Sequence, residues 1–158
     1  MDKIAPCLWF DTQALEAAKF YVSVFKKGSR IDRVAYYTPG SRRPAGQVLI
    51  VEFTLAGRAF QALNGGPEFK FTEAVSLSVP CKTQKEIDYY WKALIAGGGK
   101  PVQCGWLKDK YGLSWQIYPT AVSDAISGKD KAKATRVMNE VMKMVKPDLK
   151  AIEKAAKG

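Results

Sequence analysis

The sequence contains no histidine among its 158 residues. This absence excludes Ser-His-Asp and Cys-His catalysis, and it removes the commonest protein ligand of transition metals. The three cysteines (Cys7, Cys81 and Cys104) are an odd number without metal-type spacing, so we expect reduced thiols in a cytoplasmic protein. The absence of histidine therefore restricts the possible functions of this chain more than any motif in the sequence does.

Long hydrophobic runs are also absent. No apolar stretch approaches the roughly 20 residues that span a bilayer, and the start of the chain lacks the charged-then-apolar order of a secretion signal. The hydrophobic fraction of 47% and the charged fraction of 25% are typical of a globular protein. We therefore expect one domain with a sizeable core and no membrane partner.

Acidic residues are scarce relative to basic ones, and the net charge is +10. Residues 129–158 hold nine basic and four acidic side chains, which is half of that excess. The remaining charge is spread thinly and forms no cluster of arginines with aromatic residues. The pattern favours a solvated basic face over a nucleic-acid partner.

The most informative segment of the chain is Cys104–Pro119. A glycine-bearing turn at 110–112 precedes a strand-prone run whose side chains alternate in character. Leu113, Trp115 and Ile117 are predicted to face a core, and Ser114, Gln116 and Tyr118 to face a wet cavity.

The first part of the chain predicts one strand, one helix and three more strands. The helix has the apolar spacing of a packed helix and is expected to be capped by Asp11 or Thr12. A flexible loop covers 38–46, and Ala56-Gly57 forms a hairpin turn. The predicted elements are strand 4–10, helix 12–25, strand 30–37, strand 47–55 and strand 58–63.

The same pattern restarts about 70 residues later, with strand 74–80, helix 83–96 and the segment 104–119. Under this shift Glu16 falls on Glu86, and the aromatic and aliphatic pairs of the first helix fall on Tyr90-Trp91 and Leu94-Ile95. Matches in register predict an internal duplication of a βαβββ unit. The predicted fold class is therefore α+β, with two βαβββ modules forming curved mixed sheets around a central cavity, plus C-terminal helices.

The domain boundaries follow from this repeat. One domain is expected over 1–120, with its first module at about 3–66 and its second at about 72–120. The segment 121–158 is a helical extension, with apolar residues at helical spacing over 137–145 and a further helix from Pro147 to Gly158. Its methionines are interpreted as packing residues of helices docked on the domain or on a sister subunit.

Strand alternation places a set of polar side chains in the cavity. In the third strand Val48, Ile50, Glu52 and Thr54 share the cavity face, while Leu49, Val51, Phe53 and Leu55 face the helices. In strand 74–80 the core face is Val75, Leu77 and Val79. The predicted ligand-binding residues are Glu52, Thr54, Ser76, Ser78, Ser114, Gln116 and Tyr118.

Glu52 is the strongest candidate for a functional residue, because a carboxylate within an apolar strand is rare unless it is paired or has a function. It could act as a general base, a metal ligand or a hydrogen-bonding group, with a pKa that burial would raise. The alternative is a structural carboxylate paired with a nearby Lys or Arg. For Gln116, binding a ligand and bridging two strands are equal alternatives.

Other candidates are weaker. Cys81 and Cys104 lack a histidine partner and are read as structural thiols. The turn 64–67 resembles a phosphate cradle only slightly, since no helix start or P-loop lysine follows it. Asp109 is predicted to form a turn rather than to catalyse.

Several segments together resemble one family, the PhnB-like group often labelled 3-demethylubiquinone-9 3-methyltransferase, of the glyoxalase/bleomycin-resistance/dioxygenase (vicinal oxygen chelate) superfamily. The resemblance covers about residues 3–120 and implies paired βαβββ modules in a homodimer. The segments are Pro6–Asp11, Phe20-Tyr21 with Val24-Phe25, Glu52–Gly57, Ala62–Pro67 and Cys104–Pro119.

The resemblance also implies where a metal would be held. The four ligand positions of the superfamily's metalloenzymes fall on Ile4, Glu52, Ala74 and Gln116. Only Glu52 is retained, and one carboxylate with one amide cannot hold a divalent cation tightly. We therefore expect no metal.

Three functions remain open. The preferred one is a protein that binds a small organic molecule in a metal-free cavity between its sheets. The second, implied by the family label, is methyl transfer from S-adenosylmethionine to a quinone or aromatic hydroxyl, with Glu52 as the catalytic base. The chain lacks the glycine-rich strand-to-helix loop that usually holds this cofactor. The third is a resistance module that sequesters its ligand.

Overall fold

The computed structural model describes residues 4–158, and the expected start of the first module at about residue 3 lies outside that range. The chain forms two compact units, one ending at Lys70 and the other spanning Phe71–Gly158. Among the described residues no helix is long and apolar enough to cross a membrane.

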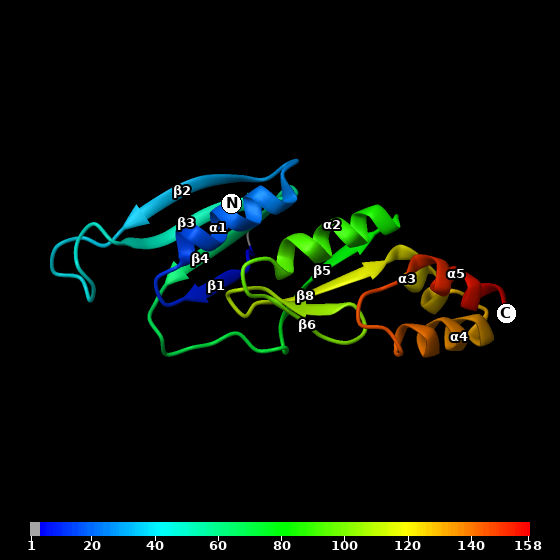
Figure 1. Ribbon diagram of the computed structural model, residues 1–158. Coiled ribbons are helices and arrows are strands. Elements are labelled where there is room, and N and C mark those ends of the chain that lie inside the picture. The colour runs from blue at the N-terminus through cyan, green and yellow to red at the C-terminus, as the bar shows by residue number, and fades with distance from the viewer. Residues whose placement is uncertain (1–3) are drawn as a thin grey trace. The chain divides into compact units, whose positions relative to one another are not determined.

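The first unit is a four-stranded sheet with one helix (Figure 1). The strand order is β1-β4-β3-β2, in which β1 runs parallel to β4 and the other neighbours are antiparallel. Its elements are β1 (Cys7–Phe10), α1 (Ala14–Phe25), β2 (Arg30–Tyr36), β3 (Val48–Leu55) and β4 (Arg58–Asn64).

Helix α1 covers one face of this sheet (Figure 1). The core between them contains Tyr21, Val51 and Phe53, all almost fully buried. Phe53 stacks on Phe60 of the neighbouring strand with ring centroids 5.5 Å apart. The predicted alternation of β3 is confirmed, because its buried apolar residues face α1 and Glu52 lies on the opposite face.

The beginning of the first unit differs from the sequence prediction. Strand β1 starts at Cys7 instead of Ile4, because Pro6 has no N–H to donate to a strand ladder and only its carbonyl is bonded, to the amide of Gln61. Ile4 is 88% exposed.

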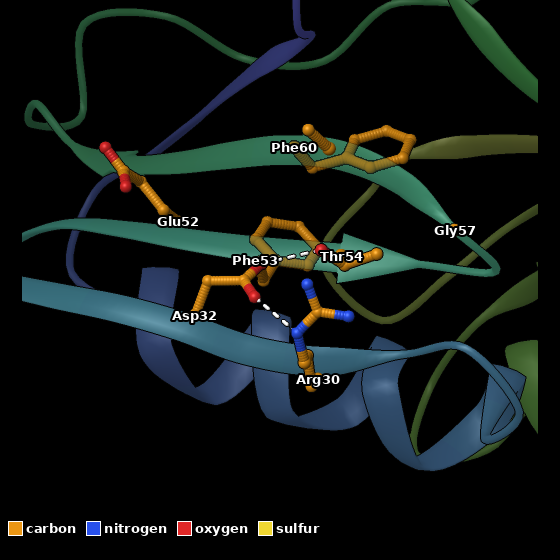
Figure 2. A pocket seen from close by; sticks show the side chains of 8 residues that line it. Arg30, Asp32, Glu52, Phe53, Thr54, Gly57 and Phe60 are labelled. Carbon is orange, nitrogen blue, oxygen red and sulfur yellow. Dashed lines mark hydrogen bonds and ion pairs between the residues drawn. The ribbon is translucent and has the colours of Figure 1, made fainter. Parts of the chain in front are cut away.

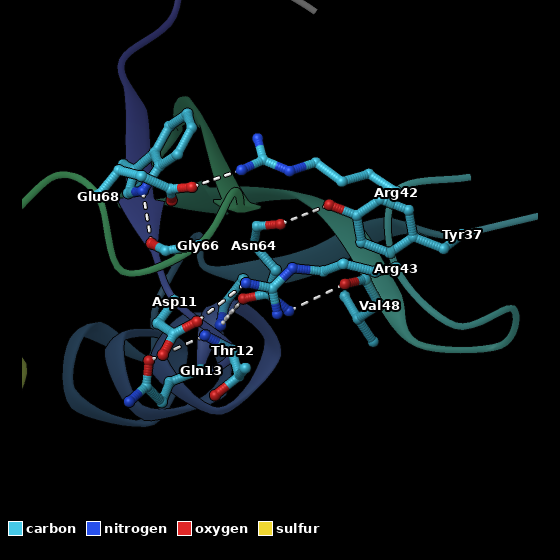
Figure 3. A network of polar contacts seen from close by, with 12 residues as sticks. Asp11, Thr12, Gln13, Tyr37, Arg42, Arg43, Val48, Asn64, Gly66 and Glu68 are labelled. Atoms are coloured by element: carbon cyan, nitrogen blue, oxygen red, sulfur yellow. Dashed lines mark hydrogen bonds and ion pairs between the residues drawn. The ribbon is translucent and has the colours of Figure 1, made fainter.

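The predicted cap of the first helix is also wrong. Neither Asp11 nor Thr12 caps α1, which begins at Ala14 and has no local side-chain cap. Instead, Asn64 at the end of β4 accepts a hydrogen bond from the Ala14 amide through Oδ1 at 2.8 Å (Figure 3). The side-chain Nδ2 of Asn64 donates to the Val48 carbonyl at 2.9 Å, so the buried Asn64 attaches the helix to the sheet.

The second unit repeats the arrangement of the first. Its sheet has the order β5-β8-β7-β6, again with one parallel pair, β5 with β8. Identical strand order and pairing in the two units confirm the duplicated βαβββ topology. The elements are β5 (Ser76–Cys81), α2 (Gln84–Ile95), β6 (Lys100–Pro101), β7 (Trp106–Lys108) and β8 (Ser114–Pro119).

Local sequence signals determine the start of α2. Thr83 is its N-cap, and the Thr83 and Glu86 side chains form a reciprocal capping box. The start of β5 was predicted two residues too early, and Val75, expected in the core, is 67% exposed before the strand.

Three short helices complete the second unit: α3 (Thr120–Ser127), α4 (Lys131–Val141) and α5 (Leu149–Lys157). They share a small core of Val122, Ala125, Val137 and Ile152. The helix expected over 137–145 ends at Val141, and Met142 and Val145 are exposed. The expected docking of the extension is confirmed within this unit, where the Met144 and Val145 carbonyls accept from the amides of Cys104 and Gly105.

Candidate functional site

The face of the first sheet opposite α1 carries Glu52. Its carboxylate forms a two-pronged ion pair with Arg33 of β2, with Nε–Oε2 at 3.0 Å and Nη2–Oε1 at 2.5 Å. The hydrogen bonds from Arg33 lower the pKa of Glu52, and a hydrogen bond from Gln61 adds to this effect, while burial opposes it. The expectation of a raised pKa is therefore wrong, because a cation lies directly opposite in the strand register.

A β-bulge adds charged groups to the same face. The pairing of β2 with β3 slips between Ile31 and Arg33, which leaves Asp32 as an extra residue. Asp32 accepts a hydrogen bond from the Thr54 hydroxyl at 2.6 Å and pairs with Arg30 at 2.7 Å (Figure 2). These groups line a cavity of about 380 Å³ together with Glu52. The sequence prediction missed Arg30, Asp32 and Arg33.

The ion pair of Glu52 predicts an acid-dependent contribution to stability. The folded pKa of Glu52 lies below its ordinary value of 4.5, so the pair stabilises the fold above that value and the gain is lost as the pH falls through the folded pKa. Urea unfolding of Arg33→Met between pH 7 and pH 3 should show less loss of stability on acidification than the wild type. Glu52→Gln should remove the same component, and equal pH dependence in all three proteins would contradict the assignment.

In the second unit, Gln116 bridges two strands. Its amide nitrogen donates to the Ser76 hydroxyl of β5 at 2.8 Å. Its carbonyl oxygen accepts no hydrogen bond within residues 4–158 and remains available. The bridging role of Gln116 is thus confirmed, while its role as a ligand-binding residue stays a prediction.

Ser114 differs from its predicted surroundings. It was placed on the wet face, but it is 0% exposed, between its register partners Ser76 and Lys108. Its hydroxyl is buried without a hydrogen-bond partner. The wet part of β8 is therefore its second half, at Gln116 and Tyr118.

A groove of about 430 Å³ lies over this part of the second sheet. Its floor brings together three of the predicted residues, Ser78, Gln116 and Tyr118, and adds Trp106 of β7. The wall comes from the C-terminal extension, which the sequence prediction treated only as packing. The lining residues from that extension are Val122, Ser123, Ile126, Met138, Val141, Met142 and Pro147.

The two cysteines considered as nucleophiles have different surroundings. Cys81 is buried, and burial raises its pKa to about 12, so its thiol is not activated. Cys104 is half-buried at the groove, with Sγ 3.5 Å from Sδ of Met142. The structural interpretation of Cys81 is confirmed.

The residues at the four superfamily ligand positions do not fit a metal. Ile4 and Ala74 supply no ligand atom, and both precede their strands. Glu52 is already engaged by Arg33. No group of three or more His, Cys, Asp or Glu side chains within residues 4–158 could hold an ion.

The described residues also lack the glycine-rich strand-to-helix loop that usually binds an adenosyl cofactor. The strand-to-helix connections of the two units, 11–13 before α1 and 82–83 before α2, contain no glycine. The acidic groups of the first cavity, Asp32 and Glu52, are already paired with Arg30 and Arg33. Neither connection fits the cofactor that the methyltransferase label implies.

Comparisons with known proteins agree with this fold. The model of the family described as 3-demethylubiquinone-9 3-methyltransferase matches residues 2–118. A putative protein of that description from Bacillus cereus, also called PhnB, is 35% identical, with 75% of this chain and 99% of that chain covered and a TM-score of 0.67.

More distant structures support the fold alone. Protein PA1353 from Pseudomonas aeruginosa has 19% identity, a TM-score of 0.60, and coverage of 75% of this chain and 98% of its own. The fosfomycin resistance protein FosX from Listeria monocytogenes, in complex with Mn(II) and sulfate, has 12% identity, a TM-score of 0.51, and coverage of 75% and 90%. No curated protein matches. The family match over most of the chain, together with the 35% identical relative, shows that this chain belongs to the PhnB-like family described as 3-demethylubiquinone-9 3-methyltransferase.

Proposed function

We propose that this protein binds a small organic molecule in the groove over the second sheet. One observation carries the proposal: a concave space of about 430 Å³ that combines Gln116, Ser78 and Tyr118 with apolar walls. Pockets for small molecules have roughly 300 to 1,000 Å³ and a few polar groups in a mainly apolar lining. The groove has both properties.

The polar groups of the groove are suited to orienting a ligand. The Gln116 amide is held by its bond to Ser76, which leaves its carbonyl oxygen as a fixed acceptor. A side chain that is already positioned loses less conformational entropy when it binds. A ligand hydroxyl or N–H would therefore find a prearranged partner at this point of β8.

Binding without turnover is the function that the charged groups support best. A general base that works near neutral pH needs a pKa close to that pH. Arg33 moves the pKa of Glu52 in the other direction. We propose metal-independent binding, in a homodimer of the kind the family resemblance implies, with Glu52 as a structural carboxylate outside the groove.

Native mass spectrometry of the purified protein tests this function. We expect an intact small molecule to co-purify with the wild type. Gln116→Leu should reduce the occupied fraction about tenfold, because its apolar side chain removes the acceptor. The matched control is Gln103→Leu, an exposed glutamine outside the groove. Full occupancy in Gln116→Leu would contradict the site.

The same preparation separates binding from methyl transfer. Because neither strand-to-helix connection fits an adenosyl cofactor, we expect no heat when S-adenosylmethionine is titrated at millimolar concentration. A saturable signal would instead support the activity in the family description.

A further inference from the structure

The wall of the groove comes from a part of the chain that the family match does not include. The family model ends at residue 118, and the Bacillus cereus relative is covered over 99% of its length by 75% of this chain. Ile126 of α3, Met138 of α4 and Met142 after it lie beyond that point and line the groove. The groove is therefore a feature that the C-terminal extension adds to the common fold.

The extension is attached firmly at the groove. The Met144 carbonyl accepts from the Cys104 amide at 2.8 Å, and the Val145 carbonyl from the Gly105 amide at 2.9 Å. Gln84 of α2 holds the next residues, since its side chain accepts from the Leu149 amide at 2.8 Å and donates to the Pro147 carbonyl at 3.2 Å. This wall is thus a fixed part of the second unit rather than a loose tail.

The chemistry of the lining is uncharged. None of the groove residues is acidic or basic, although the chain carries a net charge of +10. The apolar side chains of the extension remain open to solvent, with Ile126 45% and Met142 58% exposed. Flexible methionines adapt to ligands of irregular shape. An apolar molecule would cover this surface.

Unpaired polar groups lie on the floor opposite this apolar wall. Within residues 4–158 the indole N–H of Trp106 and the hydroxyl of Tyr118 have no hydrogen-bond partner, and neither does the carbonyl oxygen of Gln116. The groove thus offers hydrogen-bond donors and an acceptor to a ligand, but no charged side chain that could neutralise a charged ligand. A carboxylate or phosphate placed here would lose hydration without gaining a cation.

We propose that the C-terminal extension makes this groove a site for a neutral, mainly apolar compound bearing a carbonyl or hydroxyl group. The apolar part contacts Ile126, Met138 and Met142, and the polar group bonds to Trp106, Gln116 or Tyr118. This inference rests on the proposed binding function and gives its ligand class.

Two probes of one ring system test the inference. 2-Acetylnaphthalene is neutral with one carbonyl, and 2-naphthoate carries a carboxylate on the same rings. Dissociation constants from amide chemical shifts of ¹⁵N-labelled full chain should be at least about tenfold lower for the ketone. Preference for 2-naphthoate, which the net positive charge would attract over long range, would overturn the inference.

Variants of the extension locate the binding. Ile126→Asp and Met142→Asp should each weaken 2-acetylnaphthalene about tenfold, because they place a carboxylate in the apolar wall. Val75→Asp introduces the same charge at an exposed residue outside the groove lining and should bind like the wild type. Dispersed amide spectra of all three variants would establish that they are folded.

The outcomes separate this inference from the proposed function. One outcome is that the amide signals of Gln116 and Tyr118 shift equally on addition of 2-acetylnaphthalene to the wild type and to both groove variants. This result would support the proposed binding function and contradict the role of the extension. A wild type that binds neither probe overturns the inference, while the co-purification experiment still decides the function. A lower native mass in Met142→Asp, measured by light scattering, would mean that a second copy covers the groove and would also overturn it.

Discussion

Asp109→Ala should lower the free energy of unfolding by about 3 kcal/mol or more, because hydrogen bonds to a charged group are worth about 1.5 to 3 kcal/mol each and a buried donor is left unpaired. The Asp109 side chain is buried in the turn that connects β7 to β8. Its Oδ1 accepts from the amides of Tyr111 at 2.9 Å and Leu113 at 3.1 Å, and its Oδ2 from the Trp115 indole N–H at 2.8 Å. Urea unfolding at pH 7 measures the loss.

Two companion variants make the result specific. Asp109→Asn keeps the oxygen that accepts from the two amides but can turn an NH₂ group toward the Trp115 indole, so it should fall between alanine and the wild type. Asp124→Ala removes an exposed carboxylate of α3 and should change stability by no more than about 0.5 kcal/mol. Equal stability of Asp109→Ala and Asp124→Ala would mean that the turn does not depend on this carboxylate.

Gly105→Ala should lower the free energy of unfolding by about 3 kcal/mol, since a non-glycine residue in the left-handed region costs about 1 to 2 kcal/mol before any clash is counted. Gly105 has φ of +82°, and a Cβ there would lie 2.5 Å from the Ile117 carbonyl oxygen and 3.1 Å from Cγ of Pro147. The glycine joins β8 to the segment after α4, so its replacement should also displace the wall of the groove.

Gly112→Ala is the matched control for this prediction. Gly112 has φ of +85°, and no atom lies within 4 Å of a Cβ built there. It should therefore lose only about 1 to 2 kcal/mol for the backbone conformation. Thermal unfolding of both variants separates the backbone cost from the steric one, and a similar loss in both would contradict close packing at Gly105.

Features determined by neighbouring residues were predictable. The burial of Leu113, Trp115 and Ile117 followed from alternation along one strand. The helix predicted over 83–96 is confirmed as α2 with Thr83 as its N-cap, and the structure shows the capping box with Glu86. The turn role of Asp109 was predicted and is confirmed by its hydrogen bonds to Tyr111 and Leu113. All these signals extend over only a few residues of sequence.

Features that depend on strand pairing were missed. The bulge that turns Asp32 and Arg33 toward Glu52 exists only relative to β3, although the run Arg30-Ile31-Asp32-Arg33 breaks the expected alternation and could have suggested it. The cap of α1 comes from Asn64, 50 residues away from the amide that it accepts. The residues around Asp32 and around Ala14 contain no signal that identifies β3 or Asn64 as the partner.

The sequence by itself determined the duplicated βαβββ topology, the family and the exclusion of histidine chemistry, because periodicity, repeated segments and composition are properties of the chain alone. Only the tertiary structure decided the state of each candidate group. It paired Glu52 with Arg33, buried Ser114, and built a groove from Gln116 and a distant Met142. These outcomes depend on which side chains meet in space, and hydrogen bonding and burial then set their chemistry.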